Sequence, residues 1–259
     1  MTNTYLWSPK NKVNKLQEFQ NNNLSKITNN SYESLHRWSI ENKEDFWSSI
    51  WDFTEIKGEK KNPIIENEHD FINSVFFKNS KINFTENVLT KNNNDEAIVF
   101  FSEQQFERRV TWKKLNLEVN KVSKFFKKIN INKGDRIVGI LPNIPETIIS
   151  FLATAKIGAI WSSCSSDFGS RAVIDRFKQI KPKVLIISDK YFYNNKKIET
   201  LSIIDKIIKE LSCVNQIIII PYDQRKNNSY NLNYSFKTWN EILNDDYDLT
   251  ENKYEHFEF

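Results

Sequence analysis

Short apolar runs alternate with longer amphipathic segments between residues 134 and 220, and this alternation constrains the fold more than any other feature of the chain. Runs such as VLII and IIII are too short for helices, whereas the segments between them are long enough for several helical turns. Such an alternation is typical of βαβ units, whose strands lie parallel and are buried under helices on both faces. The sequence therefore predicts an α/β fold built on a mostly parallel sheet.

The elements of this region are expected in regular order, with right-handed crossovers between the strands. Strands are expected within 134–143 (after a turn) and at 159–164, 183–189 and 216–221, and helices at 144–159, 170–180 and 197–211.

A hairpin and a long helix are predicted to precede this alternation. The apolar run at 97–101 and the run at 107–112 are separated by a few polar residues, which is typical of a β-hairpin. Thr111 is a suitable N-cap for a helix whose apolar residues recur every three or four positions. These are Leu115, Val119, Val122, Phe126 and Ile129, and the lysines between them are expected to face solvent.

The first third of the chain has a helical pattern of its own. Ser31 can cap a helix that begins at Tyr32, with Leu35, Trp38 and Ile40 on one side. A second helix at 44–53 carries an aromatic-rich face, which indicates packing against another surface. The polar run KNNNDE at 91–96 favours a loop, so we predict a helical extension at 1–95 and a second domain at 96–259.

Glycine is scarce, and its positions are therefore informative. Of the 5 glycines, Gly134, Gly139, Gly158 and Gly169 fall in the predicted βαβ region. A glycine-poor chain that keeps four of its five glycines there is expected to need a positive φ or a close backbone approach at those positions.

Composition excludes several classes of function. The net charge of +4 comes from lysines spread evenly along the chain, so no nucleic-acid role is expected. No run is long enough to span a membrane, and the N-terminus lacks the apolar core of a signal peptide. Cys164 and Cys213 are expected to be buried thiols, without the spacing of a metal site. These features predict a cytoplasmic protein with no metal ligands of its own and no membrane partner.

Sequence motifs that would identify an active site are missing. The chain contains no GxGxxG or Walker loop, no GxSxG elbow, no HExxH and no kinase signature. Its residues predict a fold without a complete catalytic centre, so no catalytic residue is assigned.

Several motifs nevertheless resemble one family. The KGDRIVGILPN turn and strand, followed by a helix and KIGAI, resemble the adenylate-forming (AMP-binding) superfamily. The segments WSSCS, DFG and DRF that follow resemble its acetoacetyl-CoA synthetase branch, and so do LWSP at 6–9, the run at 35–53 and TWKKL at 111–115. The chain departs from that branch at Ser166, where proline is usual.

The resemblance implies an acid–thiol ligase that joins acetoacetate to coenzyme A and uses ATP and Mg²⁺ through an acyl-AMP intermediate. It also implies that the phosphate loop and the small C-terminal domain lie beyond Phe259. This chain is therefore expected to be an N-terminal fragment that is inactive alone. Two alternatives remain: an acetyl- or propionyl-CoA synthetase fragment, or a non-catalytic remnant or binding module.

The resemblance also implies a place for coenzyme A. Related acetyl-CoA synthetases hold its 3′-phosphate end with two arginines, and here Tyr193 and Lys196 occupy those positions, with Lys197 adjacent. The turn with Ser166, Asp167 and Gly169 would lie beside the pantetheine tunnel. The alternatives are an ordinary surface lysine for Lys196 and a helix-terminal carboxylate for Asp167. Trp161 is expected in the core, and Asp175 and Arg176 in structural ion pairs.

Overall fold

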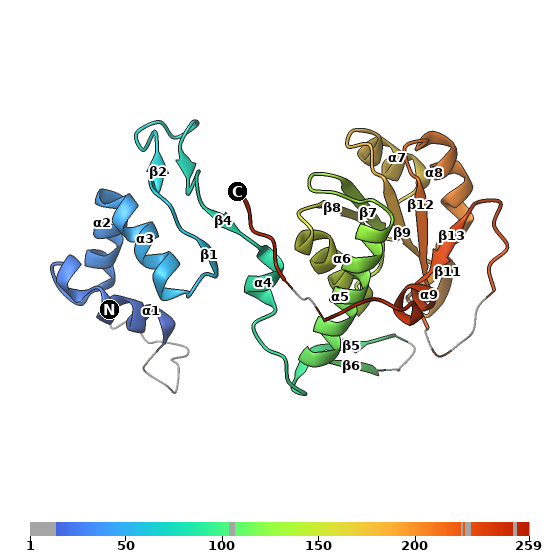
Figure 1. Ribbon diagram of the computed structural model, residues 1–259, viewed down its shortest axis with the longest axis horizontal. Coiled ribbons are helices and arrows are strands. Elements are labelled where there is room, and N and C mark those ends of the chain that lie inside the picture. Colours follow the sequence, from blue (N-terminus) through green and yellow to red (C-terminus); the bar gives the residue numbers. More distant parts are fainter. Residues whose placement is uncertain (1–13, 104–106, 224, 226–228, 251–252, 259) are drawn as a thin grey trace, which may run out of the picture. The chain divides into compact units, whose positions relative to one another are not determined.

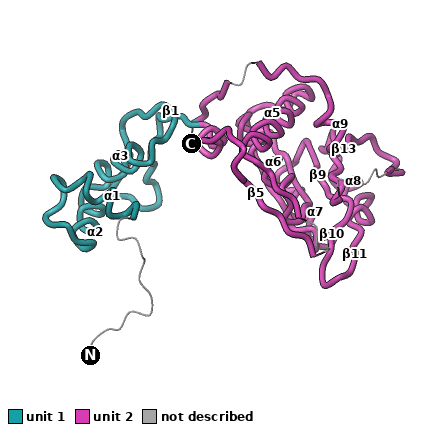
Figure 2. The backbone as a smooth tube through the Cα atoms, turned by 90° about the horizontal axis from the view of Figure 1, so that it is seen from below, with its two compact units in different colours: residues 1–82, 258–259 teal, residues 83–257 magenta. Residues whose placement is uncertain are grey.

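The chain forms two compact units in a computed structural model that describes residues 14–103, 107–223, 225, 229–250 and 253–258. The first unit comprises residues 1–82 with 258–259, and the second comprises 83–257 (Figure 2). The division falls before the 91–96 loop, because Leu89 packs into the core of the second unit. The LWSP motif at 6–9 lies outside the described residues.

Three helices build the first unit, in agreement with the helical pattern of the sequence. Ser31 caps the second of them, and its hydroxyl accepts from the Ser34 amide at 3.2 Å as predicted. Leu35 and Trp38 are buried, whereas Ile40, which was expected on the same side of the helix, is 54% exposed and does not share their burial. The helices are α1 (Lys15–Asn22), α2 (Tyr32–Glu41) and α3 (Lys43–Phe53), with a 3₁₀ turn, η1 (Leu24–Lys26), after α1.

The aromatic face predicted for α3 packs against the other two helices. Phe46, Ile50 and Phe53 contact a buried cluster that includes Phe19 and Trp38. The Phe19 ring lies edge-on to that of Phe53, with 5.1 Å between centroids, an arrangement that aromatic quadrupoles favour.

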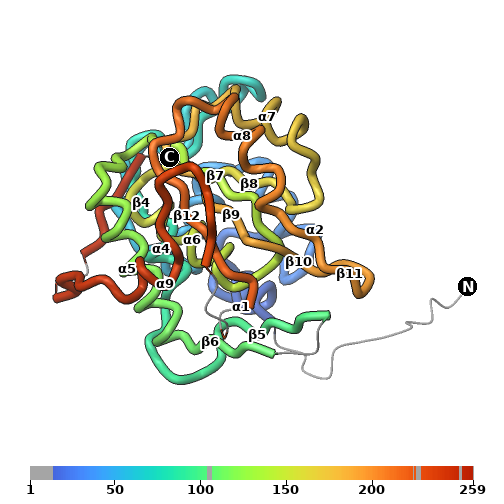
Figure 3. The backbone as a smooth tube through the Cα atoms, turned by 90° about the vertical axis from the view of Figure 1, so that its right-hand side faces the viewer, coloured from blue at the N-terminus to red at the C-terminus, as the bar shows by residue number. Residues whose placement is uncertain are grey.

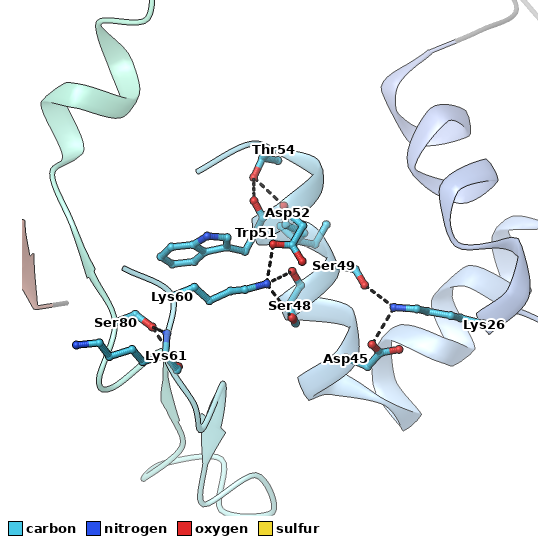
Figure 4. Close-up of polar contacts among 11 residues, drawn as sticks. Lys26, Asp45, Ser48, Ser49, Trp51, Asp52, Thr54, Lys60, Lys61 and Ser80 are labelled. Carbon is cyan, nitrogen blue, oxygen red and sulfur yellow. Dashed lines mark hydrogen bonds and ion pairs between the residues drawn. The ribbon is translucent and has the colours of Figure 1, made fainter. Parts of the chain in front are cut away.

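Lysines attach neighbouring segments to the polar side of α3 (Figure 4). Lys26 Nζ donates to Asp45 Oδ1 at 2.8 Å and to Ser49 Oγ at 2.9 Å. Lys60 Nζ donates to Asp52 Oδ1 at 2.6 Å and to Ser48 Oγ at 3.1 Å. The chain after α3 forms short strands that the sequence analysis did not predict: β1 (Gly58–Glu59), β2 (Ile65–Glu66), β3 (Val75–Phe76) and β4 (Lys81–Ile82).

The second unit confirms the predicted order of hairpin, long helix and βαβ alternation. Thr111 caps the long helix, and its hydroxyl accepts from the Lys114 amide at 3.2 Å. The elements up to β9 are α4 (Phe84–Val88), β5 (Glu96–Phe101), β6 (Glu107–Thr111), α5 (Trp112–Lys128), β7 (Arg136–Ile140), α6 (Pro145–Lys156), β8 (Ile160–Cys164), α7 (Ser170–Lys178) and β9 (Val184–Ser188). The remaining elements are β10 (Lys190–Tyr193), β11 (Lys196–Glu199), η2 (Thr200–Ile203), α8 (Ile204–Glu210), β12 (Gln216–Ile220), β13 (Phe236–Thr238) and α9 (Trp239–Asn244). The last strand, β14 (Phe257–Glu258), includes one residue of each unit.

Five parallel strands form the central sheet in the order β13-β12-β9-β7-β8 (Figure 1). When the five strands are numbered along the chain from β7 and the sheet is followed from β8 to β13, this order is the 2-1-3-4-5 arrangement of doubly wound folds. Residues that alternate along the strands face two separate cores. Val184 and Ile186 of β9 pack under α5, α6 and α9, whereas Leu185 and Ile187 pack under α7 and α8. The predicted mostly parallel sheet with helices on both faces is thus confirmed.

The segment after β9 differs from the prediction. Residues 197–199 were expected to begin a helix, but Lys196–Glu199 form β11, which pairs antiparallel with β10, and α8 begins only at Ile204. Asn194 and Asn195 have φ values of +49° and +59°, which produce a tight two-residue turn between these strands. Cys164 is buried as expected, whereas Cys213 is only partly buried.

The four glycines differ in what they require. Gly134 and Gly158 have φ values of +79° and +70°. A Cβ on Gly139 would lie 2.7 Å from the Trp161 ring. Gly169 has a φ of −65°, and no atom lies within 4 Å of its added Cβ. The expectation is therefore confirmed at three positions and wrong at Gly169.

Replacing Gly158 with alanine is expected to lower the free energy of unfolding more than the same change at Gly134. Each change places a side chain at positive φ, which costs about 1–2 kcal/mol. At Gly158 the new Cβ would also lie 2.7 Å from the Phe257 ring, whereas Gly134 has open space. Urea unfolding of the 259-residue chain measures both losses. In a Phe257→Ala background, Gly158→Ala and Gly134→Ala should lower the free energy of unfolding by similar amounts. If Gly158→Ala still has the larger effect there, the ring contact is not its cause.

Candidate functional site

The carboxyl ends of the parallel strands meet at one edge of the sheet, where doubly wound folds bind their ligands. The chain reverses its direction of winding between β7 and β9, since β8 lies on one side of β7 and β9 lies on the other. The segments that leave this edge carry every residue assigned to coenzyme A, namely the turn after β8 and the β10–β11 hairpin after β9.

Asp189 is a buried polar residue of this edge whose two carboxylate oxygens both accept hydrogen bonds. It follows β9 directly and is 4% exposed. Its Oδ1 accepts from the Tyr222 amide at 2.8 Å, which joins the end of β9 to the end of β12. Its Oδ2 accepts from Lys190 Nζ at 2.9 Å and from Tyr230 Oη at 3.3 Å. These bonds compensate a buried carboxylate that would otherwise be costly.

The β10–β11 hairpin presents three of the predicted residues. Figure 3 shows this hairpin extending outward from the sheet. Tyr193 and Lys196 face each other across the two-residue turn, and both are exposed. The Lys196 ammonium has no hydrogen bond or ion pair with another described residue. Lys197 pairs with Glu199, and the hydrogen bond that its ammonium donates to this carboxylate raises the pKa of Lys197.

The turn after β8 carries the other three residues. Ser166 is buried, and its Oγ has no hydrogen-bond partner among the described residues. Asp167 is exposed and lies before α7, whose N-cap is Gly169. Burial, and then the charge of Asp167, raise the pKa of Tyr191 on β10. The charge of the turn is therefore felt at the base of the hairpin.

Two other residues of this region, Arg176 and Trp161, contact aromatic or apolar neighbours within the fold. Arg176 lies over the Phe168 ring at 4.8 Å in a cation–π contact, and it forms none of the ion pairs found among the described residues, where one was expected. Trp161 is partly buried and packs against the core under α5 and α6. No group of three His, Cys, Asp or Glu residues capable of holding a metal ion occurs in the part of the chain that the structure describes.

Sequence reasoning missed Asp189 and a second buried charge. Glu146, at the start of α6, is 3% exposed and accepts a bidentate pair from Arg108 of β6 at 2.6 and 3.0 Å. Arg108 also lies over the Phe100 ring at 5.0 Å. A signal for Asp189 existed, because an aspartate that directly follows a buried parallel strand stands at the ligand-binding edge.

Comparison with known proteins places this fold in a family. The model for "AMP-binding enzyme" matches residues 84–248, which is more than half of the chain. The chain belongs to this family. It is 37% identical over 191 residues to the acetoacetyl-coenzyme A synthetase of Rhizobium meliloti, and 35% identical over 196 residues to the acetoacetyl-CoA synthetase of Macaca fascicularis. Each match covers 74% of this chain.

The solved acetoacetyl-CoA synthetase from Streptomyces lividans has the same fold over nearly the whole chain. The TM-score is 0.84 at 26% identity, and the match covers 94% of this chain. The chain spans 29% of the two curated relatives and 38% of the solved one. Within the described residues no helix is long and apolar enough to cross a bilayer.

Asp189→Ala is expected to destabilise the second unit by about 1–3 kcal/mol, because it leaves the Tyr222 amide buried without its acceptor. Urea unfolding measures the loss, and faster hydrogen exchange at the Tyr222 amide locates it. Asp167→Ala is the matched control, since Asp167 is exposed at the same edge and its loss should cost less than about 0.5 kcal/mol. Equal effects of the two changes would contradict the anchoring role of Asp189.

Proposed function

We propose that this chain forms part of an AMP-forming ligase that converts acetoacetate, ATP and coenzyme A into acetoacetyl-CoA, AMP and diphosphate. The observation that carries the proposal is the family match at 84–248, which covers most of the second unit, including the carboxyl ends of its parallel strands. The names of the relatives support acetoacetate as the acyl substrate. These ligands are small molecules, and no nucleic acid takes part in the proposed reaction. The proposed location of the enzyme is the cytoplasm, and Mg²⁺ is the proposed ion that accompanies ATP.

The reaction has two halves. A carboxylate oxygen of acetoacetate attacks the α-phosphorus of ATP, so that acetoacetyl-AMP forms and diphosphate leaves. The sulfur of coenzyme A then attacks the acyl carbon, the thiol proton is lost, and AMP leaves. Cations and backbone donors must neutralise the phosphate charge in the first half. This chain has no phosphate-cradling motif, so its part in the proposed enzyme is the sheet and one side of the coenzyme A entrance.

The exposed hairpin is the proposed contact for the 3′-phosphate end of coenzyme A. Lys196 stands at its tip and can attract a phosphate as a point charge, although without the fork of an arginine. Lys197 is the weaker candidate, because Glu199 already engages its charge. Tyr193 lies opposite Lys196, and the turn with Ser166, Asp167 and Gly169 is the proposed wall of the pantetheine tunnel.

The 259-residue chain is expected to show no acetoacetate-dependent exchange of diphosphate into ATP, whereas the longer protein that the proposal requires should show it. Sequencing beyond the codon for Phe259 establishes whether the reading frame continues into a phosphate loop. Exchange is measured with labelled diphosphate, and acetate and propionate serve as competing substrates. Exchange by the 259-residue chain itself would contradict the proposal that this chain supplies only the sheet and one side of the coenzyme A entrance. A preference for acetate would contradict acetoacetate as the proposed substrate.

In that longer protein, Lys196→Ala is expected to raise the KM for coenzyme A by about tenfold at most, because a partly exposed charge pair contributes on the order of 1 kcal/mol. The rate of ATP–diphosphate exchange should not change, since coenzyme A takes no part in that half-reaction. Lys197→Ala is the matched control and should have little effect. Dephospho-CoA lacks the 3′-phosphate, so equal losses with CoA and dephospho-CoA would show that Lys196 is an ordinary surface lysine.

A further inference from the structure

Four lysines converge on a pocket at the opposite edge of the sheet from the proposed coenzyme A entrance. The pocket has a volume of about 150 Å³ and lies between α5, the end of α6 and the segment that follows α9. Lys156 belongs to the last turn of α6, just before β8 begins, so the pocket lies near the amino ends of the strands. Its lining residues are Asn120, Ser123, Lys124, Lys127, Lys156, Ile157, Leu249, Lys253 and Glu255.

The wall formed by the C-terminal segment is fastened to the second unit. Asn83 Nδ2 donates to the Lys156 carbonyl at 2.9 Å and to the Glu255 carbonyl at 2.8 Å. His256 Nε2 and Glu86 Oε2 lie 2.7 Å apart. The Phe257 ring packs against Gly158. These contacts give the pocket a defined third side beside its two helical sides.

Lys156 is the central cation of the pocket. It is 9% exposed, its Nζ donates to Asn120 Oδ1, and the same Nζ lies 4.5 Å from the centre of the Tyr254 ring. Burial, and then repulsion from Lys124 and Lys127, lower the pKa of Lys156 to about 8. The lining also includes the cation of Lys253, and Glu255 carries the one carboxylate among those lining residues that the structure describes. The site therefore holds more positive than negative charge.

Helix polarity explains only part of this arrangement. The C-terminal end of a helix favours cations, which accounts for Lys127 in the last turn of α5 and for Lys156 in the last turn of α6. It does not account for the convergence of Lys124 and Lys253 on the same small pocket. An anion between these side chains would offset their mutual repulsion and would stabilise the charged form of Lys156.

We propose that this pocket binds a small tetrahedral oxyanion of the phosphate class. Ammonium groups bind phosphate oxygens through charge-assisted hydrogen bonds, and the volume suits one such group and not a whole nucleotide. The site lies away from the strand ends that the proposed reaction uses. It is therefore additional to the ligase activity, and its occupancy is linked to the protonation of Lys156.

Sulfate is the appropriate first probe, because its charge does not change between about pH 7 and pH 9, where phosphate itself titrates. Calorimetric titration of the 259-residue chain at constant ionic strength should show saturable sulfate binding in excess of chloride. Lys156 is mostly charged below its pKa of about 8 and mostly neutral above it. Binding should therefore be tighter near pH 7 than near pH 9 and should take up protons near pH 8. Inorganic phosphate should compete with sulfate.

Variants separate this site from the general charge of a lysine-rich chain. Lys124→Ala and Lys156→Met should each weaken sulfate by about fivefold, and Lys156→Met should also abolish the proton uptake near pH 8. Lys113→Ala is the matched control, because Lys113 is exposed on the same helix and does not line the pocket. Lys124 is only partly buried, so its variant tests the site even if Lys156→Met does not fold. Absence of saturable binding, or an equal loss in Lys113→Ala, would overturn the proposal.

Discussion

The complete burial of β9 is the constraint on which the second unit depends. This strand is hydrogen-bonded to β12 on one side and to β7 on the other, and both of its faces are covered. Val184, Leu185, Ile186 and Ile187 are each 0% exposed, so every residue from Val184 to Ile187 must find an apolar neighbour. Burial of such side chains contributes about 1.5–3 kcal/mol each, which requires helices on both faces. The two-sided arrangement follows from this one strand.

The same constraint concentrates polar chemistry at the strand ends. A strand buried on both faces disfavours charged groups along its length, so the first carboxylate stands where β9 stops, at Asp189. Asp189 joins β9 to β12 through the Tyr222 amide, and the β10–β11 hairpin begins at the next residue. The joined ends of β9 and β12 thereby form a rigid base for the exposed hairpin. This combination is common where loops carry binding residues.

The outcome of sequence reasoning depended on how local each feature is. Apolar runs such as 216–220 and the Thr111 cap are local patterns, and they predicted their elements correctly. Residues 197–199 were misassigned because Ile198 continues the helical spacing of the residues after it, although the Asn194–Asn195 pair was a turn signal. The sequence does place Asp189 directly after a buried strand, but its bond to the Tyr222 amide depends on tertiary contacts, as do the surroundings of Lys156.

The two hydrogen bonds of Asn83 have a consequence for how the second unit assembles. This residue opens the unit, yet its amide binds the carbonyl of Glu255, 172 positions later in the chain. A contact of such sequence separation carries a large loop-closure entropy and slows folding, whereas the hairpins and βαβ units close over short distances. The sheet can thus form before this closure, and the lysine pocket is expected to acquire its third wall after the sheet.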